Sequence, residues 1–306
     1  MSQLFFRVVL VVAGFCGACT PTGRVQVFVQ AEESIPEGIE PGMGDENIVD
    51  GWRVTYDKFL VALGDFRASR SANPQDELAF NGVHVLDLVQ LPTGGAVIAE
   101  FDDVLAARWD EVGFSLRNAT AASVQGEGVS ASDYALMTNN GYTLWIEGQI
   151  NKPGGQQCLP SNPADCAARS TVTFAWGLRV PTVFAGCASE GGEPGFAVPS
   201  GGVAQVEPTI HGDHWFFTHI TQGEEIATRR AQWVADVDVN RDGVAALSEL
   251  AATPAAQLLT STLGYNLTGS LLPSIQTVRD YLEAQARTLI DYQGDGECED
   301  RTILSD

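Results

Sequence analysis

The stretch Arg24-Val-Gln-Val-Phe-Val-Gln30 places valines at every second position, alternating with largely polar residues. Successive side chains of a β-strand point to opposite faces, so this period predicts a half-buried strand. Clusters of Gly, Pro, Asn and Asp separate the strand-like runs that follow, and a short helix is expected at 131–137. These runs lie at 53–63, 83–89, 96–101, 111–117, 142–150, 171–180 and 202–210. Many short strands with turn signals predict a mainly β chain folded as a two-sheet β-sandwich.

After residue 219 the pattern becomes helical. Thr221 and Glu224 have the spacing of a capping box, in which each side chain bonds a backbone N–H at the start of a helix. A second helix is expected from Ala246, limited by Pro254, and a last one at 274–290, where apolar residues share one stripe. The sandwich is therefore expected to be followed by a helical segment.

Composition sets the class of the protein. The chain has 306 residues, of which 44% are hydrophobic and 18% charged, as in globular proteins. Its formal net charge is -22, from 39 acidic and 17 basic side chains. Such a field repels nucleic acid and anionic lipid, which excludes both as main partners.

The N-terminus has the pattern of an export signal. Arg7 precedes an apolar run at 8–15, which is too short to span a bilayer. Cys16-Gly-Ala-Cys19 is similar to a lipobox, at which a bacterial lipoprotein is cleaved and acylated, but Cys16 stands where Leu is usual, so ordinary cleavage stays open. We expect a lipoprotein signal peptide at 1–19, a β-sandwich domain at 20–220 and a helical EF-hand-like segment at 221–306. Lipid on Cys19 would anchor the exported protein in the cell envelope, at the outer membrane, with a free periplasmic form as the alternative.

Four cysteines remain if Cys16 is removed and Cys19 carries lipid. An even number in an exported protein suggests disulfides, and four cysteines allow three pairings. Pairing Cys158 with Cys166 would close a short Pro-rich loop, and pairing Cys187 with Cys298 would tie the C-terminal region to the body. Free buried thiols are the alternative.

The stretch from Asp238 to Glu249 matches the calcium-loop pattern D-x-[DN]-x-[DN]-G-x5-E at every defined position. Calcium prefers six to eight oxygen ligands. The expected ligands are the side chains of Asp238, Asn240 and Asp242, the Val244 carbonyl, and both carboxylate oxygens of Glu249. Gly243 permits the turn, and the alternative is an acidic turn without metal. A degenerate echo at 291–302 has Thr302 where the closing Glu should be, and could be the structural partner of this loop.

Three of the four histidines fall within nine residues. His211, Asp213, His214 and His219 are the side chains there that suit zinc or copper. The alternative is a hydrogen-bonded structural turn with Trp215 and Phe217 in the core, which the absence of a fixed ligand spacing favours.

Several of these motifs resemble those of uncharacterised bacterial predicted lipoproteins. The matching pieces are Asp50-Gly-Trp52, Tyr56-Asp-Lys-Phe-Leu60, His211-Gly-Asp-His214, Glu249-Leu250 and Gly294-Asp-Gly-Glu-Cys298. This resemblance implies no activity. The β part is also distantly similar to the periplasmic copper-binding proteins associated with methanobactin, which makes copper a hypothesis.

The first functional hypothesis is a non-enzymatic, calcium-binding lipoprotein of the cell envelope, held on a membrane by its lipid and open to an unknown protein partner. The second is a copper- or zinc-binding protein that uses the histidine cluster, and the third is a secreted hydrolase. The chain contains no G-x-S-x-G, P-loop, H-E-x-x-H or dinucleotide-binding motif, which weighs against an enzyme.

Overall fold

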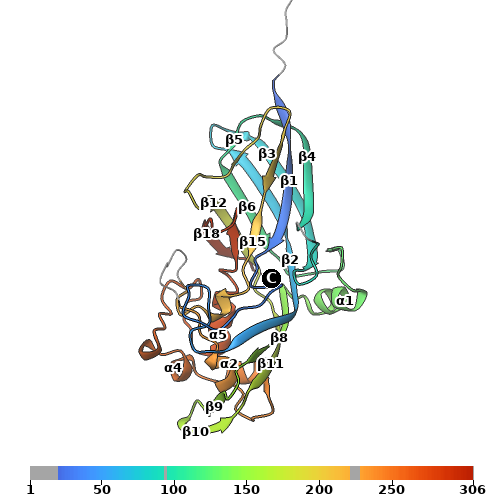
Figure 1. Cartoon of the computed structure of the whole chain (residues 1–306). Coiled ribbons are helices and arrows are strands. Elements are labelled where there is room, and N and C mark those ends of the chain that lie inside the picture. The colour runs from blue at the N-terminus through green and yellow to red at the C-terminus, as the bar shows by residue number, and fades with distance from the viewer. Residues whose placement is uncertain (1–19, 93–94, 221–227, 306) are drawn as a thin grey trace, which may run out of the picture.

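The computed structural model describes residues 20–92, 95–220 and 228–305. Within these ranges the chain is mainly β, as predicted, and its strands form two large and two small sheets (Figure 1). The signal peptide, Cys16, Cys19 and the capping box of Thr221 and Glu224 lie outside the described residues. No helix in the described part of the chain has the length and apolar character needed to cross a membrane.

The first large sheet has nine described strands in the order β16-β11-β8-β2-β6-β12-β18, with β3 on β2 and β7 on β3. Its centre is the long strand β2, which pairs with β8 along residues 53–61 and with β6 along residues 63–69. The strands are β2 (Arg53–Arg70), β3 (Asn73–Asp87), β6 (Glu111–Leu116), β7 (Val124–Gln125), β8 (Leu144–Asn151), β11 (Thr171–Leu178), β12 (Thr182–Cys187), β16 (Val244–Ala245) and β18 (Cys298–Ile303).

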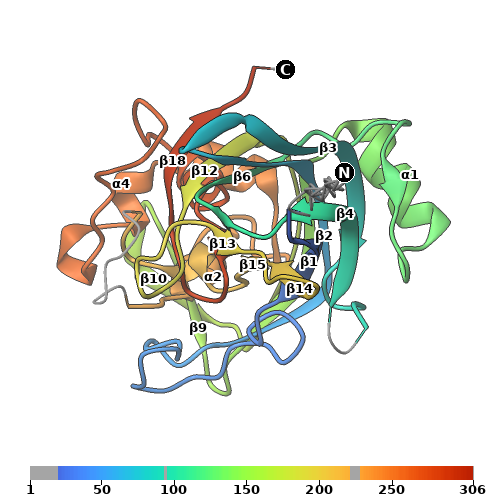
Figure 2. The same ribbon diagram turned by 90° about the horizontal axis from the view of Figure 1, so that it is seen from above.

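The second large sheet has five described strands. β1 lies at its centre, antiparallel to β4 and parallel to β14 and β15, and β15 pairs with β17. They are β1 (Thr22–Ala31), β4 (Ala96–Leu105), β14 (Val203–Val206), β15 (Pro208–Ile210) and β17 (Ile290–Tyr292). Seen from above, the two sheets curl around a shared interior as a half-barrel (Figure 2).

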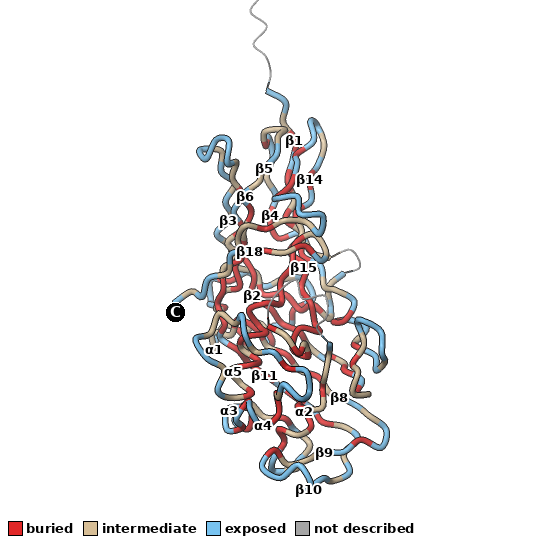
Figure 3. Tube along the Cα trace, turned by 90° about the vertical axis from the view of Figure 1, so that its left-hand side faces the viewer, coloured by how far each residue is buried: buried red, intermediate tan, exposed pale blue. Residues whose placement is uncertain are grey.

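The alternating valines at positions 25, 27 and 29 are fully buried in this interior, as their period predicts. Trp52, Trp176 and Trp215 are buried with them in one continuous apolar core, which also includes Val278 and Tyr292. Figure 3 shows this buried interior running along the long axis of the molecule. Burial of large aromatic side chains is the main stabilising contribution to such a core.

Residues 228–305 are less helical than the sequence predicted. Their helices are α2 (Gln232–Asp236), α3 (Leu247–Ala252), α4 (Ala255–Leu258), η2 (Ser261–Leu263) and α5 (Val278–Gln285). The helix predicted over 274–290 is shorter at both ends. It begins only after Thr277, whose side chain caps it by accepting from the Asp280 N–H, and beyond its end Ile290 pairs with Ile210 in a β-ladder. The same segment supplies β16 and β18 to the nine-stranded sheet and β17 to the five-stranded sheet. The short helix expected at 131–137 is present as α1 (Ala131–Asn140), packed outside the first sheet (Figure 1).

Two disulfides join the four cysteines in the pairing described above, Cys158–Cys166 and Cys187–Cys298. The first links the hairpin strands β9 (Gln156–Leu159) and β10 (Asn162–Ala168), and the second links β12 to β18. The remaining small sheet pairs β5 (Arg108–Trp109) with β13 (Phe196–Ala197). The β9–β10 hairpin and strands β12 and β18 were not predicted from the sequence.

Candidate metal centre

A turn clamped at Gly212 positions the histidine cluster between β15 and the 3-10 helix η1 (His214–Phe216). The Gly212 N–H donates to Ser34 Oγ at 2.9 Å, and its carbonyl accepts a hydrogen bond from the Tyr56 hydroxyl. A Cβ at this position would lie 2.7 Å from Ile35 Cγ1 and 3.0 Å from Ser34 Oγ, so no larger residue fits without displacement. The turn therefore holds the residues on either side of Gly212 in place.

Three of the four side chains proposed as ligands converge. His211, Asp213 and His214 each offer one ligand atom within 4.8 Å of the other two. All three residues are buried, with exposed fractions of 7%, 4% and 7%. The two imidazole rings are stacked, with centroids 5.1 Å apart and an interplanar angle of 26°.

Electrostatics favour the metal-binding protonation states of His214 and Asp213. Burial lowers the pKa of His214 to about 3, so its imidazole is neutral at pH 7, which is the form that coordinates metals. Burial acts to raise the pKa of Asp213, but His214, Arg229 and His211 outweigh it and hold that pKa below its usual value. Arg229 contacts one carboxylate oxygen, Oδ2, with Nε and Nη2 each at 2.5 Å.

Hydrogen bonds determine which ring nitrogen of His214 is free to bind a metal. Its Nδ1 lies 3.1 Å from Thr288 Oγ1, and that hydroxyl donates its own proton to the Gln285 carbonyl at 2.9 Å. The Thr288 oxygen therefore accepts a hydrogen bond from Nδ1–H, which leaves the lone pair on Nε2. Fixing the tautomer through the second nitrogen is the usual arrangement around a metal-binding histidine.

Two buried atoms of the cluster have no hydrogen-bond partner, His211 Nε2 and Asp213 Oδ1. Asp291, on β17, brings Oδ2 to 3.3 Å from His211 Nε2, outside hydrogen-bond geometry, and its Oδ1 also lacks a partner. Burial, followed by Glu297 and Asp213, raises the pKa of Asp291 well above its usual value. From the sequence, Asp291 was expected to belong to the degenerate calcium loop and not to this site.

His219 is not part of the cluster, contrary to the sequence-based interpretation. Its Nδ1 lies 3.1 Å from the hydroxyl of the neighbouring Thr218, and its backbone bridges to Asn266. The cause is the 3-10 turn at 214–216, which ends the extended backbone on which residues 211 and 219 would have shared a face. Trp215 is fully buried, as the alternative interpretation of this stretch expected, whereas Phe217 is only half-buried.

The calcium-loop residues form a closed turn. Gly243 has a φ of +90°, a conformation that suits glycine, and its N–H donates to Asp238 Oδ2 at 2.9 Å. Glu249 folds back over the loop, where its two oxygens accept from the N–H groups of Asn240 and Ala246, each at 3.2 Å. The Asn240 amide donates to Asp242 Oδ2 at 3.0 Å. Among the described residues, the three loop carboxylates do not come within 4.8 Å of one another as the histidine cluster does.

The short strand of the calcium loop does not pair with the degenerate loop at 291–302, which was the partner expected from the sequence. Val244, whose carbonyl was the expected ligand, lies in β16 and pairs with Thr173 of β11, parallel to it. The degenerate loop at 291–302 instead contributes to β17 and β18, in other parts of the structure. A strand of the main sheet therefore occupies the place that a second loop takes in paired EF-hands.

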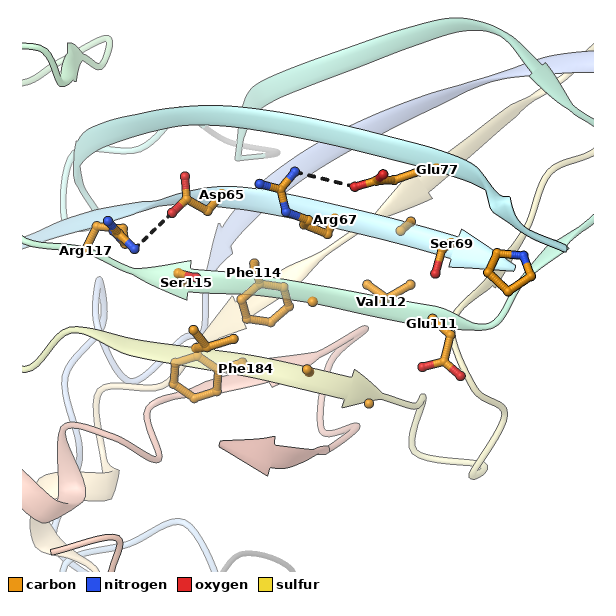
Figure 4. Close-up of a pocket in the computed structure, with 16 residues that line it drawn as sticks. Asp65, Arg67, Ser69, Glu77, Glu111, Val112, Phe114, Ser115, Arg117 and Phe184 are labelled. Atoms are coloured by element: carbon orange, nitrogen blue, oxygen red, sulfur yellow. Dashed lines mark ion pairs between the residues drawn. The ribbon is translucent and has the colours of Figure 1, made fainter. Parts of the chain in front are cut away.

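Two of the hollows in the surface bear on the candidate sites. Asp213 lines a pocket of about 180 Å³ together with several acidic residues, namely Glu32, Glu33, Glu37, Glu40 and Glu46. A second hollow, of about 480 Å³, lies over β2, β6 and β12 (Figure 4). Four of its charged side chains form two ion pairs, Arg117 with Asp65 at 3.3 Å and Arg67 with Glu77 at 3.7 Å.

Comparison with known proteins found no matching family model, no matching curated protein and no matching solved structure.

Proposed function

We propose that this protein binds a divalent transition metal, Zn²⁺ or Cu²⁺, through His211, Asp213 and His214. The observation that carries the proposal is the convergence of three buried ligand atoms within 4.8 Å of one another. Buried polar atoms without partners are costly, at about 1–3 kcal/mol each, and His211 Nε2 and Asp213 Oδ1 are two such atoms. A bound cation would satisfy both.

The donor set favours this class of metal. Imidazole suits zinc and copper, and carboxylate oxygen completes many of their sites. The acidic pocket beside Asp213 would attract a cation from solvent toward the buried cluster. The negative charge of the whole chain acts in the same direction.

Calcium binding at Asp238–Glu249 is the second proposed function. The positive φ of Gly243 and the fold-back of Glu249 support it, because a calcium loop requires both a sharp turn and a closing carboxylate. Asp238 is fully buried and Glu249 is 8% exposed, so calcium would also offset charge inside the protein. Because the loop strand β16 pairs with β11, calcium bound in the loop would stabilise the fold.

One experiment distinguishes the two proposed metal sites. Purified protein is stripped with EDTA and titrated with Zn²⁺, Cu²⁺ and Ca²⁺ by calorimetry. The double variant His211→Ala/His214→Ala should lose Zn²⁺ or Cu²⁺ binding and retain Ca²⁺ binding, whereas Asp242→Ala should do the reverse. His219→Ala is the matched control for the first variant and should bind like the parent. Unchanged Zn²⁺ and Cu²⁺ binding in the double variant would reject the histidine site.

Export and anchoring belong to the same proposal and rest on the signal-like N-terminus. Attachment of lipid at Cys19 would place the metal-binding body in the cell envelope. The test is expression in a bacterium with labelled fatty acid. The parent chain should take up label and partition with membranes, and Cys19→Ser should do neither.

A further inference from the structure

We infer that Asp291 is a fourth protein ligand of this metal centre, which makes a closed site of two imidazoles and two carboxylates. The inference rests on the proposed function of the His211–Asp213–His214 cluster. It adds a residue from β17, 77 positions beyond His214 in the chain.

The spacing of Asp291 and His211 is that of two ligands on one ion. Zinc lies about 2.0–2.2 Å from nitrogen and oxygen ligands, so two ligands at a tetrahedral angle are separated by about 3.4 Å. Asp291 Oδ2 lies 3.3 Å from His211 Nε2. The two atoms are too poorly aligned to form a hydrogen bond, since Nε2 is without a partner. A shared cation accounts for both the short distance and the missing hydrogen bond.

The unpartnered atoms lie around the same buried histidine, although Asp291 is outside the group of three whose ligand atoms are mutually within 4.8 Å, so its carboxylate would have to turn toward the ion to bind it. His211 Nε2, Asp213 Oδ1 and Asp291 Oδ1 are all buried and all lack partners. Asp213 presents Oδ1 because Arg229 occupies only its Oδ2. One divalent cation would serve all three side chains and would neutralise two carboxylates that otherwise lie together at low exposure.

The backbone holds these ligands in register. β15 and β17 are antiparallel, with Ile210 opposite Ile290, and the His211 N–H donates to the Leu289 carbonyl at 2.9 Å. The two ligands therefore come from adjacent ends of one β-ladder, which is a more rigid support than a loop. A metal here would link the turn at Gly212 to β17.

A closed centre has consequences for the class of metal and of protein. Four protein ligands leave no open position for water or substrate, which is typical of structural or storage sites and not of hydrolytic ones. Nitrogen and carboxylate donors select borderline divalent ions, whereas Cu⁺ prefers thiolate and thioether ligands. Because such a site has no open position for water, a closed centre would argue against the secreted-hydrolase hypothesis.

The test uses cobalt(II), whose visible spectrum reports its coordination number. The stripped full-length protein is titrated with Co²⁺ and then with Zn²⁺ as competitor, for the parent, Asp291→Asn and Asp295→Asn. Asp295 is an exposed carboxylate four residues away, so its variant controls for the loss of one charge near the site. We expect the parent to show the intense bands of four-coordinate cobalt, Asp291→Asn to bind at least about 100-fold more weakly with weaker bands, and Asp295→Asn to match the parent. Asp291→His, which keeps a ligand, should recover most of the affinity.

The outcomes separate this inference from the function on which it rests. If the parent binds neither cobalt nor zinc, and does not bind Cu²⁺ in the calorimetric titration, the proposed function fails. If the parent binds but Asp291→Asn has the same affinity and spectrum, the cluster is a metal site without Asp291 and only the fourth ligand is refuted. An unchanged spectrum with affinity reduced about tenfold would likewise overturn the ligand assignment, since Asp291 would then act by orienting His211.

Discussion

Replacement of Arg229 by methionine is the sharpest test of the electrostatics around the candidate metal centre. Arg229 holds one oxygen of Asp213 with two nitrogens at 2.5 Å, and the two side chains are only 13% and 5% exposed. Methionine has a similar length and would retain the packing of the stem against the Phe217 ring, over which the guanidinium lies at 4.7 Å. The variant therefore removes charge while disturbing packing little.

The expected cost follows from burial. Removing one partner of a buried ion pair leaves an uncompensated charge and costs about 3–5 kcal/mol of unfolding free energy. Arg53 with Glu40 is a matched control, since its distance is a comparable 2.6 Å but its side chains are 46% and 61% exposed. Exposed pairs contribute about 0–1 kcal/mol, so Arg53→Met should change stability little.

The assay is equilibrium unfolding in urea, followed by tryptophan fluorescence, with EDTA present and the disulfides intact. We expect Arg229→Met to lower the unfolding free energy several-fold more than Arg53→Met. Saturating Zn²⁺ should restore more stability to Arg229→Met than it adds to the parent, because the ion takes over as the counter-charge of Asp213. Equal losses in the two variants without metal would refute the reasoning about a buried, charge-dependent cluster.

Three further predictions concern other parts of the structure. Gly212→Ala should weaken zinc binding at least about tenfold in calorimetry and destabilise the protein by about 1–3 kcal/mol, because a Cβ would meet Ile35 Cγ1 at 2.7 Å. Burial raises the pKa of Asp236 to about 6, so the folded state binds the proton of this carboxyl more tightly than the unfolded state does. The contribution of Asp236 to the free energy of unfolding therefore becomes more favourable as the pH falls from about 6 toward 4. Asp236→Asn should therefore stabilise the protein by roughly 1–3 kcal/mol at pH 7.5 and by less at pH 4.5, measured by urea unfolding at both values. Replacing Cys187 and Cys298 by serine should cost about 5 kcal/mol, against about 2–3 kcal/mol for the other disulfide, because the closed loops span 111 and 8 residues. Thermal melts of the two double variants measure that difference.

The sequence predicted best where a local pattern determines the structure. The valines of β1 are buried because alternation along a strand depends only on the strand itself. Helix α1 was predicted correctly at its start, where Ser130 caps the helix by accepting from the Asp133 N–H at 3.1 Å. Pairing of Cys158 with Cys166 could be proposed from sequence because the two residues are close along the chain.

Features that depend on distant partners could not be predicted in this way. The apolar stripe over 274–290 has a helical period, yet Ile290 joins β17 because Ile210 is available opposite it. Asp291 reaches His211 only through the same ladder, and no spacing in the sequence indicates that contact. His219 was included because it is near in sequence, whereas the 3-10 turn after Asp213 moves it away from the cluster.

The participation of residues 290–303 in both large sheets bears on the order in which this protein is made and folded. β1 cannot pair with β14 and β15 until these strands, which follow it by well over a hundred residues, have been synthesised. β17 and β18 are synthesised later still, and they complete sheets whose other strands precede them in the chain. Pairings of such long sequence separation form slowly, since closing large loops is entropically costly. During synthesis the ribosome would therefore release a polypeptide that has completed neither sheet, with apolar strands exposed to chaperones and to any machinery that handles unfolded chains.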